Sequence, residues 1–245
     1  MLYGPNGKRW AMTERGRSAL SRSASHLEIG RSAMSFDGST LSLSIDEIGV
    51  PVPLRLRGRI RLYPNGLGAN TYPLDGDARH LWRPLAPSAR VEVEMTDPDL
   101  RWSGHGYFDH NRGSAPIEDD FSRWTWARLK LSGGSAIVYD STPRRGESVS
   151  LALRYGTNGE AIPFDPPPFV SLRPTGWRIA REMRSENAGE AAARTLEDTP
   201  FYARSIIRAQ LCGEIATGIH ESLSLDRFTN RVVQSMLPFR MPRRR

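Results

Sequence analysis

Hydrophobic and polar residues alternate along much of the chain with a period of two, which is the period of a β-strand. The clearest case is LRLRGRIRL at residues 54–62, where leucine, glycine and isoleucine occupy one face and four arginines the other. The same alternation predicts seven further strands, over residues 40–47, 90–96, 124–131, 148–155, 177–183, 201–211 and 215–225. Only residues 187–194 favour a helix.

Turn-forming residues separate these segments. Glycine, proline, asparagine and aspartate gather in FDGS, YPNG, LSGG and GTNG, which begin at residues 36, 63, 131 and 156. Many short strands between such turns predict an all-β barrel or sandwich.

A proline-rich segment, HLWRPLAP at residues 80–87, predicts a boundary between a domain over residues 1–86 and one over 87–245. Before it we identify only about five strands, whereas a small barrel closes with roughly eight. We therefore expect the first domain to be incomplete, with at least one strand missing upstream of LYGP at residues 2–5.

The composition is that of an ordinary globular protein, with 38% hydrophobic and 25% charged residues. The sequence has no run of about 20 apolar residues that would span a membrane and no apolar segment typical of a signal peptide. Cys212 is the only cysteine, which excludes an internal disulfide and a cysteine cluster for zinc. We expect a cytoplasmic protein without a metal site.

The net charge of +7 raises the possibility of nucleic-acid binding. No helix-turn-helix, zinc-finger or RNP pattern supports it, and the basic residues are arginines scattered through predicted strands, so we expect no nucleic-acid partner. One cluster stands at the end, in PFRMPRRR, with Arg240, Arg243, Arg244 and Arg245. This tail is either a solvated terminus or a contact for an anionic membrane surface.

The segment GHGYFDHNRG at residues 104–113 suggests chemistry. If it is extended, His105, Tyr107, Asp109 and Asn111 share one face. Asp109 is then either a turn former or a buried acid, and the residues alone leave both open. A calcium loop is rejected, because Ser114 stands where such a loop needs glycine and strands flank the segment.

Five separated motifs in one order carry a resemblance to a known family. They are LYGPNGKRWAMTERGR, HLWRPLAP, GHGYFDHNRGSAPIEDDFSRWTWARL, TLEDTPFYARS, and HESLSLDRF with MLPFRMPRR. From residue 3 to its end the chain resembles the carotenoid 1,2-hydratases, also called hydroxyneurosporene synthases. The resemblance implies two lipocalin-like, calycin-type antiparallel β-barrels, no cofactor, and addition of water to the terminal C1=C2 bond of acyclic carotenoids such as neurosporene and lycopene. Family members normally carry further residues before the LYGP segment, so part of the N-terminal region is expected to be missing.

The resemblance also implies roles for individual residues. Hydration of such an alkene requires a proton on the less substituted carbon, which produces a tertiary carbocation that water captures. Burial favours the protonated form of a carboxyl group, and the resemblance matches Asp109 to the family's catalytic aspartate. It places Tyr107, His80 and Trp82 at active-site positions, where the aromatic rings face the cation and His80 holds water or accepts its proton. Without the resemblance, Tyr107 and Trp82 would be interpreted as core aromatics and His80 as a hydrogen-bonded structural histidine.

His105 and Asn111 share the face of Asp109 and are candidate substrate contacts. The expected partners are an acyclic carotenoid and, peripherally, the membrane surface that holds it. Two other functions stay open: a terpenoid cyclase or isomerase that uses the same acid, and a lipid- or carotenoid-binding lipocalin-like protein without catalysis. An Asp109 beside Trp82 and Tyr107 favours an enzyme, whereas one that caps its own turn in solvent favours a binding protein.

Overall fold

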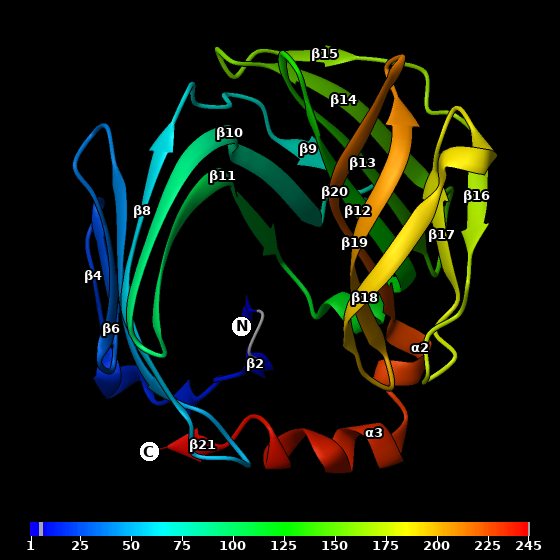
Figure 1. The fold of residues 1–245 in the computed structure, drawn as a ribbon. Coiled ribbons are helices and arrows are strands. Elements are labelled where there is room, and N and C mark those ends of the chain that lie inside the picture. Colours follow the sequence, from blue (N-terminus) through cyan, green and yellow to red (C-terminus); the bar gives the residue numbers. More distant parts are fainter. Residues whose placement is uncertain (5–6, 245) are drawn as a thin grey trace. The chain divides into compact units, whose positions relative to one another are not determined.

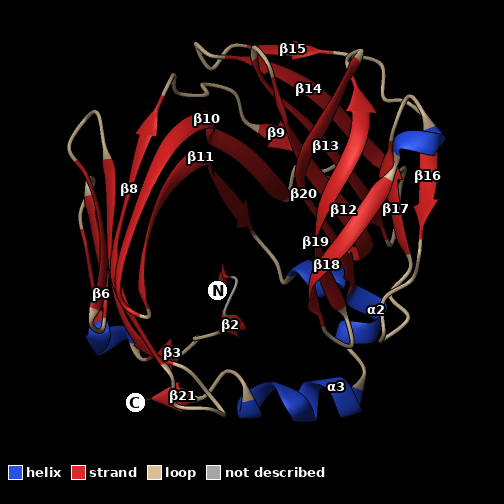
Figure 2. Ribbon diagram, in the orientation of Figure 1, coloured by secondary structure: helices blue, strands red, loops and turns tan. Residues whose placement is uncertain are grey.

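The computed structural model describes residues 1–4 and 7–244 and consists mainly of antiparallel β-strands with a few short helices (Figures 1 and 2). This confirms the predicted all-β class. The chain forms two compact units, which are interleaved along the sequence. Unit 1 comprises Met1–Pro64, Ala89–Gly106 and Gln234–Arg245, and unit 2 comprises Asn65–Ser88 and Tyr107–Val233. The sequential domain boundary at residue 86 stays a prediction.

Two long strands contribute to both units. β10 (His80–Asp97) and β11 (Asp99–Gly113) are each divided, between Ser88 and Ala89 and between Gly106 and Tyr107. They belong to a sheet with the strand order β11-β10-β8-β7-β6-β5-β4, and β9 (Tyr72–Pro73) pairs with β10. The other strands of this sheet are β4 (Leu20–Arg22), β5 (His26–Ile29), β6 (Ser32–Phe36), β7 (Leu41–Ile48) and β8 (Arg55–Pro64).

In unit 1 the alternation of β8 is realised as predicted. Leu56 and Leu62 are buried, whereas Arg57 and Arg59 are exposed. Leu56 packs with Val91 and other apolar residues of β10 in the core of this unit. β1 (Leu2–Gly4) and β2 (Gly7–Arg9) form a separate two-stranded sheet.

Unit 2 is built on a sheet with the order β15-β14-β13-β12-β20-β19-β18, whose central strands lie side by side in Figure 1. Both faces of β12 are covered, because Ala127 and Leu129 enter one hydrophobic cluster and Trp126 enters another. A hairpin of β16 (Phe169–Leu172) and β17 (Arg181–Arg184) supplies Leu172 and Met183 to the first cluster. The strands of the sheet are β12 (Phe121–Leu131), β13 (Gly134–Pro143), β14 (Val149–Gly156), β15 (Ala161–Pro163), β18 (Ala192–Asp198), β19 (Tyr202–Leu211) and β20 (Glu214–Ser224).

The helices are short, and none in the described part of the chain has the length and apolar character needed to cross a bilayer.

The helix predicted over residues 187–194 is wrong. Asn187 caps a single turn, and Ala192–Asp198 then pairs with β19, because strand pairing outweighs local helix preference. The helical elements are η1 (Arg17–Ala19), α1 (Ile117–Asp120), η2 (Ala188–Glu190), α2 (Leu225–Phe228), α3 (Arg231–Met236) and η3 (Leu237–Phe239).

The basic tail is packed against the N-terminal region of unit 1. β21 (Arg243–Arg244) pairs in parallel with β3 (Glu14–Arg15), and the Arg243 guanidinium lies 2.6 Å from the Glu14 carboxylate. The indole nitrogen of Trp10 donates to the carbonyl oxygen of Arg240, whose guanidinium lies over the Trp10 ring. Arg240 and Arg243 therefore have protein contacts; the Arg244 side chain and Arg245 lie outside the described part.

Candidate active site

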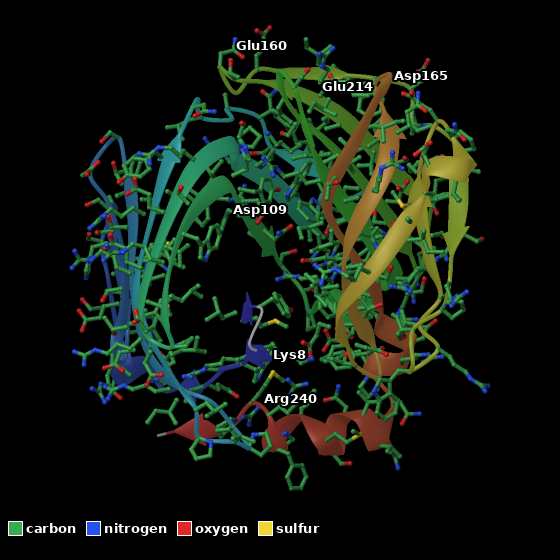
Figure 3. All side chains as sticks on the ribbon, in the orientation of Figure 1. Lys8, Asp109, Glu160, Asp165, Glu214 and Arg240 are labelled. Carbon is green, nitrogen blue, oxygen red and sulfur yellow. The ribbon has the colours of Figure 1, made fainter. Side chains whose placement is uncertain are left out.

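Asp109 accepts two hydrogen bonds through one oxygen. The indole nitrogen of Trp82, on β10, donates to Asp109 Oδ2 over 2.8 Å, and the Tyr107 hydroxyl donates to the same atom over 2.9 Å. Trp82 and Tyr107 also approach one another, with 3.2 Å between the indole nitrogen and the phenolic oxygen. All three residues belong to unit 2, and Figure 3 labels Asp109 on β11.

The local structure explains this arrangement. Tyr107 and Asp109 are two residues apart on an extended strand, so their side chains lie on one face. The adjacent strand β10 contributes Trp82, which has no exposed surface and whose N–H therefore needs an acceptor. Both hydrogen bonds reach Asp109 Oδ2, and Oδ1 receives none from any described residue.

Aromatic rings surround the three residues. The Trp82 ring centroid lies 5.6 Å from that of Tyr72 and 5.5 Å from that of Tyr139, and the centroids of Tyr107 and Trp126 are 5.1 Å apart. These side chains belong to one hydrophobic cluster of unit 2. An aromatic wall presents negative ring faces, which attract a cation without donating a nucleophile.

The electrostatics of the cluster keep its phenols neutral. Burial, followed by the negative charge of Asp109, raises the pKa of Tyr107 well above its ordinary value. The same two causes raise the pKa of Tyr139. Tyr107 therefore remains a hydrogen-bond donor to Asp109 across the physiological pH range.

A partly buried cation lies over the ring of Tyr107. The Arg128 guanidinium is 5.5 Å from the Tyr107 ring centroid, and its Nε donates to the carbonyl oxygen of Pro87 over 2.9 Å. Burial lowers the pKa of Arg128 to about 10, so it stays charged at neutral pH.

His80 is placed near this cluster but bonded to another residue. It is buried, as is Trp82 two positions later, and the alternating burial of β10 puts both on one face of the strand. Its Nε2 lies 2.7 Å from Oδ2 of Asp120, the last residue of α1, and its ring meets Phe121 edge-on.

The two candidate substrate contacts are not part of the buried cluster. His105 is exposed and belongs to unit 1, and Asn111 is exposed and has no hydrogen bond to Asp109. Other acidic side chains of unit 2, such as Glu160 and Glu214, lie at the end of the seven-stranded sheet where β14 leads to β15 and β19 turns into β20 (Figure 3).

Sequence reasoning missed several members of the surroundings. Trp126 and Arg128 stood in a predicted strand but received no role, and Tyr139 lies in a strand that was not predicted. Asp120 stands in an acidic run, Glu118–Asp120, to which the sequence analysis gives no role. Trp126 and Arg128 could have been found from the period-two pattern of β12, which places them on the face opposite Ala127.

Comparison with known proteins decides the family. The family model for the carotenoid hydratase CrtC matches residues 1–245. The chain belongs to the CrtC carotenoid hydratase family. It is 53% identical over 244 residues to the acyclic carotenoid 1,2-hydratase of Thiocapsa roseopersicina and 45% identical over 245 residues to that of Rubrivivax gelatinosus. The expected resemblance is confirmed.

Coverage differs among the CrtC relatives. The chain aligns over 99% of its own length with the two just named but spans only 60% of theirs. It covers 85% of the Rhodobacter capsulatus acyclic carotenoid 1,2-hydratase, at 41% identity. Among solved structures, the crystal structure of CghA with Sch210972 aligns at a TM-score of 0.45 and 13% identity, over 80% of this chain and 68% of that one.

Proposed function

We propose that this member of the CrtC family is an acyclic carotenoid 1,2-hydratase, a hydro-lyase that adds water to the terminal C1=C2 bond of substrates such as neurosporene and lycopene. The observation that carries the proposal is Asp109, which accepts from Trp82 and Tyr107 rather than from the backbone of its own turn. A protein that only binds a carotenoid has no need of an acid oriented by two donors. The names of the relatives support the substrate class.

The reaction follows from the two oxygens of Asp109. In its acid form Asp109 carries the proton on Oδ1, since Oδ2 is occupied by two donors, and transfers it to C2 of the alkene. A new C–H bond forms, the π bond breaks, and C1 becomes a tertiary carbocation. The hydrogen bonds from Trp82 and Tyr107 stabilise the carboxylate that remains, and its negative charge stabilises the adjacent cation.

Water then completes the addition. Its oxygen bonds to C1, and the proton that it releases is taken up by a base, for which His80 is the candidate. The ring faces of Trp82 and Tyr107 stabilise the cation until water arrives, and the Tyr107 hydroxyl stays protonated throughout. No cofactor takes part in this scheme.

The decisive experiment uses purified protein and lycopene in detergent micelles, with product analysis for the mass gain of one water. Asp109→Asn keeps the shape but removes the acid, so hydration should fall by about 100-fold or more. Asp99→Asn, an exposed aspartate of the same strand, is the matched control. Near-normal turnover by a folded Asp109→Asn protein would exclude Asp109 as the acid. Absence of product from the unmodified chain, while the Thiocapsa roseopersicina relative forms it, would exclude the activity.

Peripheral membrane association is part of the proposal. Acyclic carotenoids are apolar and partition into bilayers, so the protein must meet them at a membrane surface. Cationic side chains close to an anionic leaflet contribute about 1 kcal/mol each. The tail from Arg240 onward is the candidate contact, although Arg240 and Arg243 also have partners within unit 1.

A further inference from the structure

Three acidic residues, Glu118 to Asp120, lie in α1 just before β12. The last of them, Asp120, contacts the side chain of His80. His80 Nε2 and Asp120 Oδ2 are 2.7 Å apart, and the side chains are only 7% and 16% exposed. The neighbouring Asp119 is exposed and has no such contact. Asp120 therefore differs from the solvated acidic run in which it stands.

The contact fixes which nitrogen of His80 carries the hydrogen. An ionised carboxylate only accepts hydrogen bonds, so the ring nitrogen that faces Asp120 must donate. In neutral His80, Nε2 is then protonated and Nδ1 presents a lone pair. This is the arrangement in which a carboxylate orients an imidazole that acts as a base.

Several other contacts hold the pair in place. Arg79 Nη1 lies 2.9 Å from Asp120 Oδ1, so both carboxylate oxygens are bound. The Asp75 carboxylate accepts the backbone N–H of His80 over 2.8 Å. The edge-on Phe121 ring, whose centroid is 4.9 Å from that of His80, restricts rotation of the imidazole.

The free nitrogen of His80 faces a glycine. A Cβ at Gly113 would lie 2.5 Å from Nδ1 and 2.8 Å from Cε1, closer than van der Waals contact allows. Nδ1 has no hydrogen-bond partner among the described residues, and it is not sealed from solvent, in contrast to Nδ1 of His220. Glycine at position 113 thus leaves room for this edge of the His80 ring, which a side chain there would obstruct.

We propose that Asp120 is a positioning residue of the hydration site, which holds His80 with Nε2 protonated so that Nδ1 accepts a hydrogen bond, and then a proton, from the attacking water. The inference rests on the proposed function. It gives a reason for the burial of His80 on the same face of β10 as Trp82, whose indole binds the acid Asp109.

The first test is independent of activity. Long-range ¹H–¹⁵N spectra of the histidines at neutral pH report which ring nitrogen is protonated, and His80→Ala assigns the signals. We expect the Nε2–H form of His80 in the unmodified protein and a larger share of the Nδ1–H form in Asp120→Ala. A wild-type His80 protonated at Nδ1 would overturn the proposal, even if Asp120→Ala does not fold.

The second test is kinetic, with lycopene in detergent. Asp120→Ala should lower kcat roughly ten- to hundredfold with little change in KM, and Asp119→Ala should have no effect. In a His80→Ala background Asp120→Ala should cause no further loss, because it acts through His80. An equal loss of kcat with and without His80 would show a general structural role and overturn the proposal. If the unmodified chain is inactive, the function fails, whereas the spectra still test the position of His80.

Discussion

Acidification should destabilise the protein through His220, a residue with no part in the proposed chemistry. His220 is 1% exposed, on β20, and its Nε2 donates to the carbonyl oxygen of Glu182 over 2.9 Å. Its Nδ1 is sealed and has no partner among the described residues. A proton on Nδ1 would therefore be buried without an acceptor, near the positively charged Arg181. Burial is the main cause that lowers the pKa of His220 to about 4.

The sign and size follow from proton linkage. In the unfolded chain a histidine has a pKa near 6.5, so between about pH 6.5 and pH 4 the unfolded state binds a proton that the folded state does not. Stability therefore rises with pH over this window and is lost as the pH falls through it. At about 1.4 kcal/mol per pH unit, the loss reaches about 2 kcal/mol at pH 5 and about 3 kcal/mol at pH 4.

Urea unfolding at pH 7 and pH 5 measures this loss. His220→Gln can still donate to the Glu182 carbonyl but does not titrate. From pH 7 to pH 5 the free energy of unfolding of the variant should therefore fall by about 2 kcal/mol less than that of the wild type. His26→Gln, at an exposed histidine of β5, is the matched control and should behave as the wild type. Parallel pH dependence in wild type and His220→Gln would refute the assignment.

Two further predictions concern the cation and the membrane. If the Tyr107 ring stabilises the carbocation, Tyr107→Phe should retain about 0.5–2 kcal/mol more transition-state stabilisation than Tyr107→Leu, measured as kcat/KM. Equal losses of kcat/KM in the two variants would instead assign the role of Tyr107 to the hydroxyl that donates to Asp109. Binding to anionic liposomes should decrease with salt and on removal of residues 243–245, measured by co-sedimentation; unchanged binding after truncation would exclude the tail.

The strands that the sequence predicts well are those with one polar face. β8, β19 and β20 alternate in sequence and in burial, so a period of two is visible. β13 was missed because its first six residues, Gly134 to Tyr139, are all buried, which removes the alternation. The first half of β10 was missed because Pro84 and Pro87 indicate a linker, although the segment is extended and paired with β9.

The site was predictable where it is local. Tyr107 and Asp109 share a face because they are two residues apart on one strand, and that relation holds in any strand. Trp82 on β10 donates to Asp109 on β11, and the two residues are 27 positions apart in the sequence. The alternation of polar and apolar residues does not predict this contact, and only the family resemblance identified Trp82 as a candidate site residue. Asp120 had no local signal, because its partner His80 is 40 positions away.

The parallel pairing of β3 with β21 has a consequence for synthesis of the chain. Glu14 leaves the ribosome 229 residues ahead of its partner Arg243. At roughly 5–20 residues per second, the delay is on the order of 10–45 seconds. During that time Trp10 and Glu14 have no C-terminal partner, while the whole of unit 2 emerges. Docking of the N-terminal segment of unit 1 therefore cannot be completed until Arg243 has left the ribosome.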